Sequence, residues 1–217
     1  MRPCPVHASW SDAPPLAAPT LAEVFATHAA DAAATGFAVA HLRPGARVLW
    51  VQDRLSRREG GRPLVSSFGV SVEMLHLEVA RAADALWAME EALGCPALAA
   101  VVGEVWGEPR ALDVTATKRL AMRAEAHGVR AWLIRRAAQP DLSAARERWR
   151  LASLPSAPPQ DDARAPGEPS WRAVLFRARG SRTGEWEAGP AGVRWRPGEP
   201  VLAGAGAEPG RLARRVA

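Results

Sequence analysis

The run Ala97–Val102 is the feature that most restricts the fold, because every residue in it is apolar. Such a run is typical of a central parallel strand that helices cover on both faces. Further strands are expected at 21–25, 47–52, 74–79 and 129–134, with helices at 29–41, 82–93 and 115–127. Strands that alternate with helices predict an α/β fold with right-handed crossovers and a mainly parallel sheet flanked by helices.

The second part of the chain changes character. Alternating segments predict strands at 148–153, 171–177, 185–187 and 192–196, the last three forming an antiparallel meander. Residues 53–71 are polar and basic and are expected to be a loop, and Thr115 is the expected N-cap of the helix that follows. The predicted organisation is a flexible arm (1–19), an α/β core (20–153), a Pro/Ala/Asp-rich linker or loop (154–170), a β meander (171–196) and a basic flexible tail (197–217).

The loop after the first strand lacks the residues that bind nucleotide phosphates. A phosphate-binding loop of the form G-x-x-x-x-G-K-T needs glycines for close approach and a lysine for the phosphate oxygens. Asp31, Ala32 and Ala33 stand where Gly, Lys and Thr would be, and the single lysine of the chain, Lys118, lies far from this loop. The sequence therefore predicts no nucleotide binding, no cofactor and no enzyme activity.

Charge is unevenly distributed along the chain. Residues 1–117 carry a formal charge of −4, whereas residues 118–217 carry +9, and all basic residues except Lys118 are arginine. A basic C-terminal half fits a nucleic-acid or acidic-protein partner. The alternative is a generally basic surface without a specific partner.

Other classes of function find little support. No run approaches the roughly 20 apolar residues that a membrane span needs, and no signal peptide is expected, so a cytoplasmic location is predicted. Cys4 and Cys95 do not form a disulfide framework, and no second pair of ligands completes a metal site. The histidines show no metal-ligand spacing, and no nucleophile elbow is present.

Several segments resemble the ImuA family, RecA-like proteins of bacterial damage-induced mutagenesis, in its alphaproteobacterial form. These segments are residues 82–93, 97–104, 112–120, 148–150 and 171–180, within a resemblance that covers about 20–196. The resemblance implies a degenerate RecA-like core at 20–153 without competent nucleotide machinery. In that frame Glu104 follows the strand where a magnesium-binding Asp would stand, and Asp53 lies near the position of a catalytic glutamate.

The resemblance also implies partners. They are an ImuB-type Y-family polymerase subunit, an error-prone replicative-type polymerase, RecA and DNA, which together support translesion synthesis in the SOS response. The chain is thus expected to be a non-catalytic accessory protein that is cytoplasmic and associated with the nucleoid during DNA damage.

Arginines are the candidate contact residues. Five that follow the last core strand are expected to bind DNA phosphates or base edges: Arg135, Arg136, Arg146, Arg148 and Arg150. Three in the tail are expected to contact a partner: Arg211, Arg214 and Arg215. The alternative for the first group is a solvated basic edge around a buried Trp149, and the tryptophans between these arginines favour packing of the meander core over base stacking.

Two other functions remain open at this level. One is a cell-division inhibitor resembling SulA, which binds the tubulin-like division protein on a degenerate RecA-like fold. The other is a regulator that caps or dismantles RecA filaments. The basic C-terminal half and the Trp-Arg meander favour the ImuA interpretation.

Overall fold

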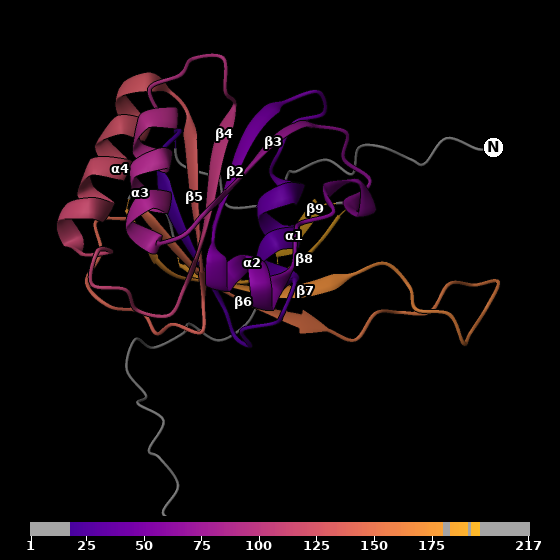
Figure 1. The fold of residues 1–217 in the computed structure, drawn as a ribbon. Helices are drawn as coiled ribbons and strands as arrows, with labels where there is room; N and C mark the ends of the chain where they lie inside the picture. Colours follow the sequence, from indigo (N-terminus) through magenta and orange to yellow (C-terminus); the bar gives the residue numbers. More distant parts are fainter. Residues whose placement is uncertain (1–17, 180–182, 191, 196–217) are drawn as a thin grey trace, which may run out of the picture.

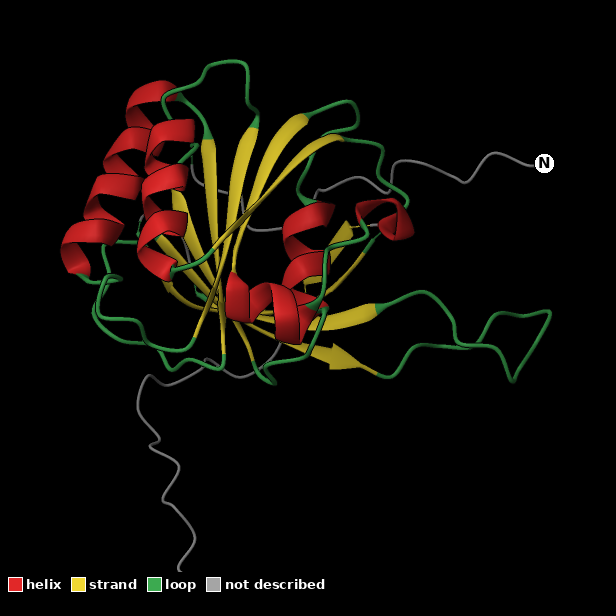
Figure 2. Ribbon diagram, viewed as in Figure 1, coloured by secondary structure: helices red, strands yellow, loops and turns green. Residues whose placement is uncertain are grey.

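A computed structural model describes residues 18–179, 183–190 and 192–195. Within these ranges one sheet has the strand order β3-β2-β4-β5-β1-β6-β7-β8-β9 (Figures 1 and 2). The strands of the parallel part are β1 (Leu21–Ala26), β2 (Arg47–Asp53), β3 (Glu73–Val79), β4 (Ala100–Trp106), β5 (Arg130–Arg136) and β6 (Glu147–Leu154). The predicted α/β fold with a mainly parallel sheet is confirmed.

Helices cover both faces of this sheet. Helix α1 (Ala33–Ala40) packs on one face, whereas α3 (Ala82–Ala92) and α4 (Val114–His127) lie together on the other (Figure 1). A short helix α2 (Arg54–Gly60) begins directly at the end of β2, and a single 3₁₀ turn spans Val65–Phe68. The carboxyl ends of neighbouring parallel strands lie at the same end of a sheet. Because α2 follows β2 and the loop follows β1, both lie at this carboxyl end.

The C-terminal strands form the predicted antiparallel meander, which continues the sheet rather than standing apart from it. β7 (Ser170–Ala178) pairs with β6, β8 (Gly184–Gly189) pairs with β7, and β9 (Gly192–Trp195) pairs with β8. The segment between β6 and β7, predicted as a linker or loop, contains no helix or strand. Residues of the predicted arm and tail lie almost entirely outside the described ranges, as 1–17 and 196–217 do.

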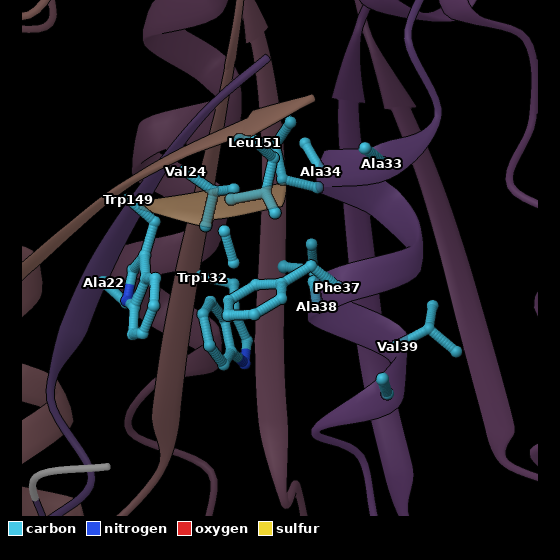
Figure 3. Packing of buried hydrophobic residues seen from close by; sticks show 14 of the residues in the cluster. Ala22, Val24, Ala33, Ala34, Phe37, Ala38, Val39, Trp132, Trp149 and Leu151 are labelled. Carbon is cyan, nitrogen blue, oxygen red and sulfur yellow. The ribbon is translucent and has the colours of Figure 1, made fainter. Parts of the chain in front are cut away.

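Two apolar clusters fill the two faces of the sheet. On the α1 face, Phe37 packs its ring against Trp132 (6.0 Å between centroids) and Trp149 (4.9 Å), as Figure 3 shows. Trp171 and Trp186 of the meander belong to the same cluster. The expectation that meander tryptophans serve core packing therefore holds for Trp149, Trp171 and Trp186.

The second cluster joins α3 and α4 to the opposite face through Leu86, Met89, Leu120 and Leu133. Gly103 of β4 lies so close to Met89 that a Cβ at position 103 would overlap the thioether sulfur. This helix–sheet contact is closer than any side chain at position 103 would permit.

Three local predictions were wrong. Residues 53–71 contain α2 and the 3₁₀ turn, because the Asp53 carboxylate accepts a hydrogen bond from Ser56 N (2.7 Å) and starts a helix that has no apolar stripe. The N-cap of α4 is Asp113, whose carboxylate accepts from Ala116 N (2.7 Å), and not Thr115. The strand predicted at 97–102 is displaced to Ala100–Trp106, because Glu104 is paired and stays in the sheet.

Candidate functional site

The loop between β1 and α1 lies where an α/β protein of this kind would hold a phosphate. The Asp31 carboxylate accepts hydrogen bonds from Ala33 N (2.8 Å), Ser153 N (2.8 Å) and Ser153 Oγ (2.6 Å). Burial alone would raise the pKa of Asp31. The bonds from Ser153 and Ala33, with the charge of His28, outweigh it and hold the pKa below its ordinary value. Asp31 thus ties the loop to β6 as an anion.

Arg136, at the end of β5, fills the interior of this loop. Its Nη1 donates to the carbonyl oxygens of Ala29 (2.9 Å) and Asp31 (3.1 Å), and its Nη2 donates to Thr35 Oγ1 (2.8 Å). The side chain is only 3% exposed. A phosphate site presents N–H donors to an anion, whereas this loop directs carbonyl oxygens at a cation of the protein's own. The loop is therefore organised as a receptor for a guanidinium group.

Glu104 of β4 completes the coordination of that guanidinium. Its Oε2 accepts from Arg136 Nε (2.7 Å) and its Oε1 accepts from Trp50 Nε1 (2.9 Å), and the carboxylate is 1% exposed. This is the residue that the family resemblance placed near a magnesium-binding Asp. Here both of its oxygens are bonded to protein donors.

Asp53, the position compared with a catalytic glutamate, has a structural role in the described conformation. Its Oδ1 caps α2 through Ser56 N, and its Oδ2 accepts from Trp106 N (3.1 Å). At the other end of α2, a Cβ at Gly60 would lie 3.0 Å from Arg136 Nε, so the helix packs directly over the buried arginine. Asp53, Glu104 and Arg136 thus hold one edge of the sheet together.

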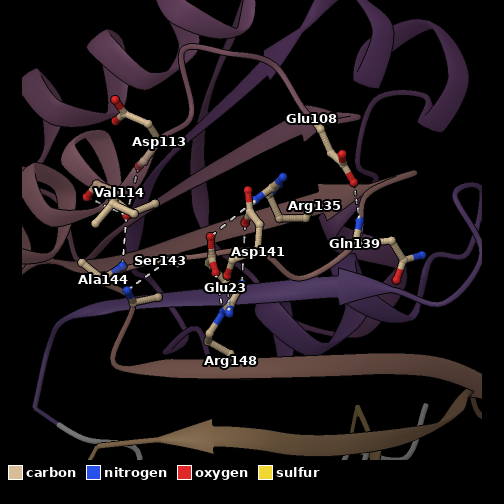
Figure 4. A network of polar contacts seen from close by, with 12 residues as sticks. Glu23, Glu108, Asp113, Val114, Arg135, Gln139, Asp141, Ser143, Ala144 and Arg148 are labelled. Atoms are coloured by element: carbon tan, nitrogen blue, oxygen red, sulfur yellow. Dashed lines mark hydrogen bonds and ion pairs between the residues drawn. The ribbon is translucent and has the colours of Figure 1, made fainter. Parts of the chain in front are cut away.

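A second buried ion network lies on the other side of β1. Glu23, which is fully buried, accepts from Arg148 Nε (2.7 Å) and pairs with Arg135 Nη1 (3.5 Å), as Figure 4 shows. Asp141 Oδ1 reaches both arginines at 3.6 and 3.9 Å, and its carbonyl oxygen accepts from Arg148 Nη1 (2.8 Å). The buried charges of Arg135 and Arg148 are therefore offset by the buried carboxylate of Glu23 and by the half-exposed carboxylate of Asp141.

Aromatic rings extend this network across the sheet. The guanidinium carbons of Arg135 and Arg148 lie 5.5 and 5.2 Å from the centroid of Phe25, and those of Arg148 and Arg150 lie 5.5 and 5.3 Å from that of Phe176. Arginine and phenylalanine thus alternate from β5 to β7 at distances suited to cation–π contact. The row ends at Arg150, which is exposed and makes no ion pair within the described part of the chain.

The five arginines predicted to bind DNA do not form one basic surface. Arg135, Arg136 and Arg148 are buried in the ion pairs just described. Arg146 makes a two-pronged contact with Glu125 (2.7 and 3.2 Å), which leaves Arg150 as the exposed and unpaired member. DNA binding itself stays a prediction, and Arg211, Arg214 and Arg215 lie outside the described residues.

Sequence reasoning missed the acidic partners of these arginines. The signal was present, because Glu23 and Glu104 lie inside otherwise apolar strands, where an ionised carboxylate needs a buried cation. Two adjacent arginines at the end of β5 supply such cations on opposite faces of the sheet. Alternation along a strand predicts opposite faces, but not which partner each side chain meets.

The described residues contain no group of three or more His, Cys, Asp or Glu side chains placed to hold a metal ion. Cys95 is exposed and free, and Cys4 lies outside the described ranges. Among the described helices, none has the length and apolar character to cross a bilayer.

Comparison with known proteins relates the chain to ImuA. No protein-family model matches the chain. The protein ImuA of Caulobacter vibrioides, found in two strains, is 33% identical over 154 residues, covering 66% of this chain and 60% of the relative. The chain therefore spans less than two thirds of the length of the curated relatives that it matches. The motifs of the sequence resemble those of the ImuA family, and the observed fold is of the class expected from that resemblance. Together with the 33% identity, this shows that the chain is a distant homologue of ImuA.

Proposed function

We propose that this protein is a non-catalytic accessory protein of damage-induced mutagenesis. In this role it links an ImuB-type polymerase subunit and an error-prone replicative-type polymerase with RecA, with DNA, or with both. The homology to ImuA supports the process, and the proposed location is the cytoplasm, at the nucleoid during DNA damage. Deleting the gene should lower the frequency of mutations induced by ultraviolet light, and an unchanged frequency would contradict the role.

The proposal that the protein is not a catalyst rests on one observation, which is that the guanidinium of Arg136 lies inside the loop after β1. Nucleoside triphosphate hydrolysis needs backbone donors and a cation directed at the phosphates, with magnesium held nearby. Here the carbonyl oxygens of Ala29 and Asp31 point inward, and Glu104 is bonded to Arg136 and Trp50. The space and the charges that a triphosphate requires are used for internal packing.

Copurification tests the partners and the chemistry together. The tagged chain is expected to capture the ImuB-type subunit and RecA of the same bacterium without retaining labelled ATP. Capture of neither protein would contradict the linking role. ATP binding with turnover would contradict the interpretation that Arg136 fills the loop after β1 and leaves no room for a nucleotide, whether or not a partner is captured.

Arg150 is the residue proposed to meet DNA. It is exposed, its guanidinium carbon lies 5.3 Å from the centroid of Phe176, and it alternates along β6 with Trp149 and Leu151, which belong to the cluster on the α1 face. Arg150→Ala should reduce the salt slope of single-stranded DNA binding by about one, measured by filter binding of end-labelled DNA. Arg146→Ala is the matched control, because Arg146 is engaged with Glu125, and equal effects of the two variants would remove Arg150 from the interface.

The tail is proposed to contact a protein partner through Arg211, Arg214 and Arg215. Its basic charge motivates the proposal, and the residues lie outside those the structure describes. Truncation after Arg196 should weaken binding to the polymerase subunit or to RecA while leaving the circular dichroism spectrum of the core unchanged. Undiminished affinity of the truncated chain would refute it.

A further inference from the structure

Strand β3 is an open edge of the sheet. It is the terminal strand of the sheet and pairs with β2 alone among the described strands (Figure 1). Helix α3 packs mainly on β4 and β2 and makes fewer contacts with β3, so β3 is only partly covered by it. An unpaired edge with no proline or lysine to block it is a template for pairing with another strand.

The backbone of β3 shows which groups are open. Glu73 N donates to Ala46 O (2.9 Å), so the polar groups of Glu73 point toward β2. In a parallel pair these groups alternate in direction from one residue to the next. Leu75 and Leu77 therefore also turn their backbone groups inward, whereas Met74, His76 and Glu78 direct theirs outward from the sheet.

The side chains add an apolar surface to this edge. Leu75 and Leu77 lie opposite Leu49 and Val51 in the register with β2, on the face that α3 covers further along the sheet. Their exposures are 50% and 38%, which is high for leucines on a parallel strand. Burying these two leucine side chains away from water would be favourable, and it requires a second surface that packs against them.

We propose that β3 pairs antiparallel with β3 of a second copy of this chain, with His76 on the two-fold axis. This inference is independent of the proposed role in mutagenesis. In this register His76 exchanges both backbone hydrogen bonds with His76 of the second copy, and Met74 does the same with Glu78 of the second copy. Every outward backbone group of the strand between residues 74 and 78 is then satisfied.

The same register brings the leucines together. Leu75 faces Leu77 of the second copy at a pair without hydrogen bonds, where side chains approach most closely. The two-fold repeats this contact, so four leucines form one apolar patch across the junction. The sequence around His76 is thus self-complementary, as an isologous interface requires.

The charges of the strand permit this register. Glu73 would lie opposite Val79 and Glu78 opposite Met74, so no carboxylate faces another across the junction. Both glutamates already have cationic partners, since Arg47 Nε lies 3.0 Å from Glu73 Oε2 and Arg57 Nε lies 3.6 Å from Glu78 Oε2. A second copy therefore offers apolar complementarity without placing like charges opposite each other.

Sedimentation velocity over a range of concentrations tests the assembly. The full chain is expected to form a dimer that dissociates on dilution. His76→Pro removes an outward N–H and leaves the backbone hydrogen bonds to β2 in place, while it loses the side-chain bond to Gln52. Leu77→Lys places a charge in the apolar patch, and each variant should weaken the dimer by at least about tenfold. Leu142→Lys is the control, because Leu142 is an exposed leucine remote from β3 in the fold.

Disulfide trapping tests the register. In a background carrying Cys4→Ser and Cys95→Ser, an equimolar mixture of Leu75→Cys and Leu77→Cys chains should form a covalent dimer on mild oxidation. Either chain alone should not, because the same positions of the two copies are diagonal rather than opposite.

Three outcomes would overturn the proposal. One is a chain that stays monomeric at every concentration. This would contradict the proposal even if β3 were found to pair with a strand of a different protein. The second is a dimer indifferent to both β3 variants, which would place the contact elsewhere, including the terminal segments. The third is trapping that occurs equally with either cysteine variant alone. Thermal unfolding of each variant shows whether a lost dimer reflects a lost fold.

Discussion

At the scale of single residues, Arg136 occupies the loop after β1, where an α/β protein that binds phosphate would hold its anion. Its guanidinium replaces the ligand that the loop of an ATP-binding protein would hold, and it brings Glu104, Thr35 and the loop carbonyls to a common centre. A buried guanidinium with this many acceptors stabilises the fold only while all of its partners are present.

Arg136→Ala should lower the free energy of unfolding by about 3–5 kcal/mol, because it leaves the Glu104 carboxylate buried without its cation. Arg146→Ala, which removes an exposed pair with Glu125, should cost less than about 1 kcal/mol. Urea denaturation checks both values. Replacing both partners, as Glu104→Gln with Arg136→Met, should recover part of the loss, and a double variant less stable than Arg136→Ala would contradict this account.

His41 should make stability depend on pH. Burial lowers the pKa of His41 to about 4, against the hydrogen bond to Phe37 O and together with the charge of Arg130. The unfolded chain then binds a proton at higher pH than the folded chain does. The stabilisation is complete above about pH 6.5 and is lost as the pH falls toward 4, by up to about 3 kcal/mol.

Urea midpoints measured between pH 7.5 and 4 check this dependence. His41→Gln has no titrating group at this position, so its midpoint should vary less over the same window. Parallel curves for the two proteins would show that another group is responsible, such as Asp31, whose depressed pKa acts at the acid end.

At the scale of elements, α1 joins the parallel core to the meander. Gly36 weakens a helix by its flexibility, yet a Cβ at this position would overlap the ring of Trp171 and lie 2.8 Å from Phe68 Cε1. The glycine therefore permits a close helix–sheet contact that no side chain allows.

Gly36→Ala should destabilise the protein by about 1–3 kcal/mol, although alanine is the better helix former. Combining it with Trp171→Phe should cost less than the sum of the two single changes, because the smaller ring relieves the overlap. Thermal or urea unfolding of all four proteins measures this coupling. Strict additivity would contradict a direct contact between the two positions.

Much of the element order was predictable from the sequence. Apolar strands such as β4 and β5 and the amphipathic helix α3 have strong periodic signals, so their existence was predicted. The ends of α3 agree with the prediction to within one residue, whereas those of the two strands are displaced toward the C-terminus. Helix α2 was missed because Arg54–Gly60 has no apolar stripe, and only the Asp53 cap gives a local signal. The candidate site was harder, since Arg136 meets Ala29 and Glu104 only after the strand order is known.

At the scale of the whole molecule, the proposed junction at β3 should respond to acid. His76 Nε2 bonds Gln52 Oε1 (2.8 Å), and burial with the charges of Arg62 and Arg57 lowers the pKa of His76, against the opposing effect of Glu78. At the two-fold axis each His76 also faces its copy. Protonation would place like charges together there, so the dimer should weaken as the pH falls from 7.5 to 5.

Sedimentation at the two pH values checks this dependence, with His76→Gln as the matched variant whose dimer should change less. A dimer that strengthens in acid would contradict the placement of His76 on the axis. The gel-filtration volume of the monomeric Leu77→Lys chain at both pH values controls for acid expansion of the fold.

The two faces of the sheet also differ in their content of buried tryptophan, which determines what intrinsic fluorescence can report. The deeply buried tryptophans Trp50, Trp132, Trp149, Trp171 and Trp186 all belong to the cluster on the α1 face, whereas the cluster under α3 and α4 contains none. The chain has no tyrosine, so its intrinsic fluorescence comes from tryptophan. Trp87 of α3 is 66% exposed and already meets water, so loosening of α3 should change its emission little. A change in emission will therefore report mainly on the buried tryptophans of the α1 face.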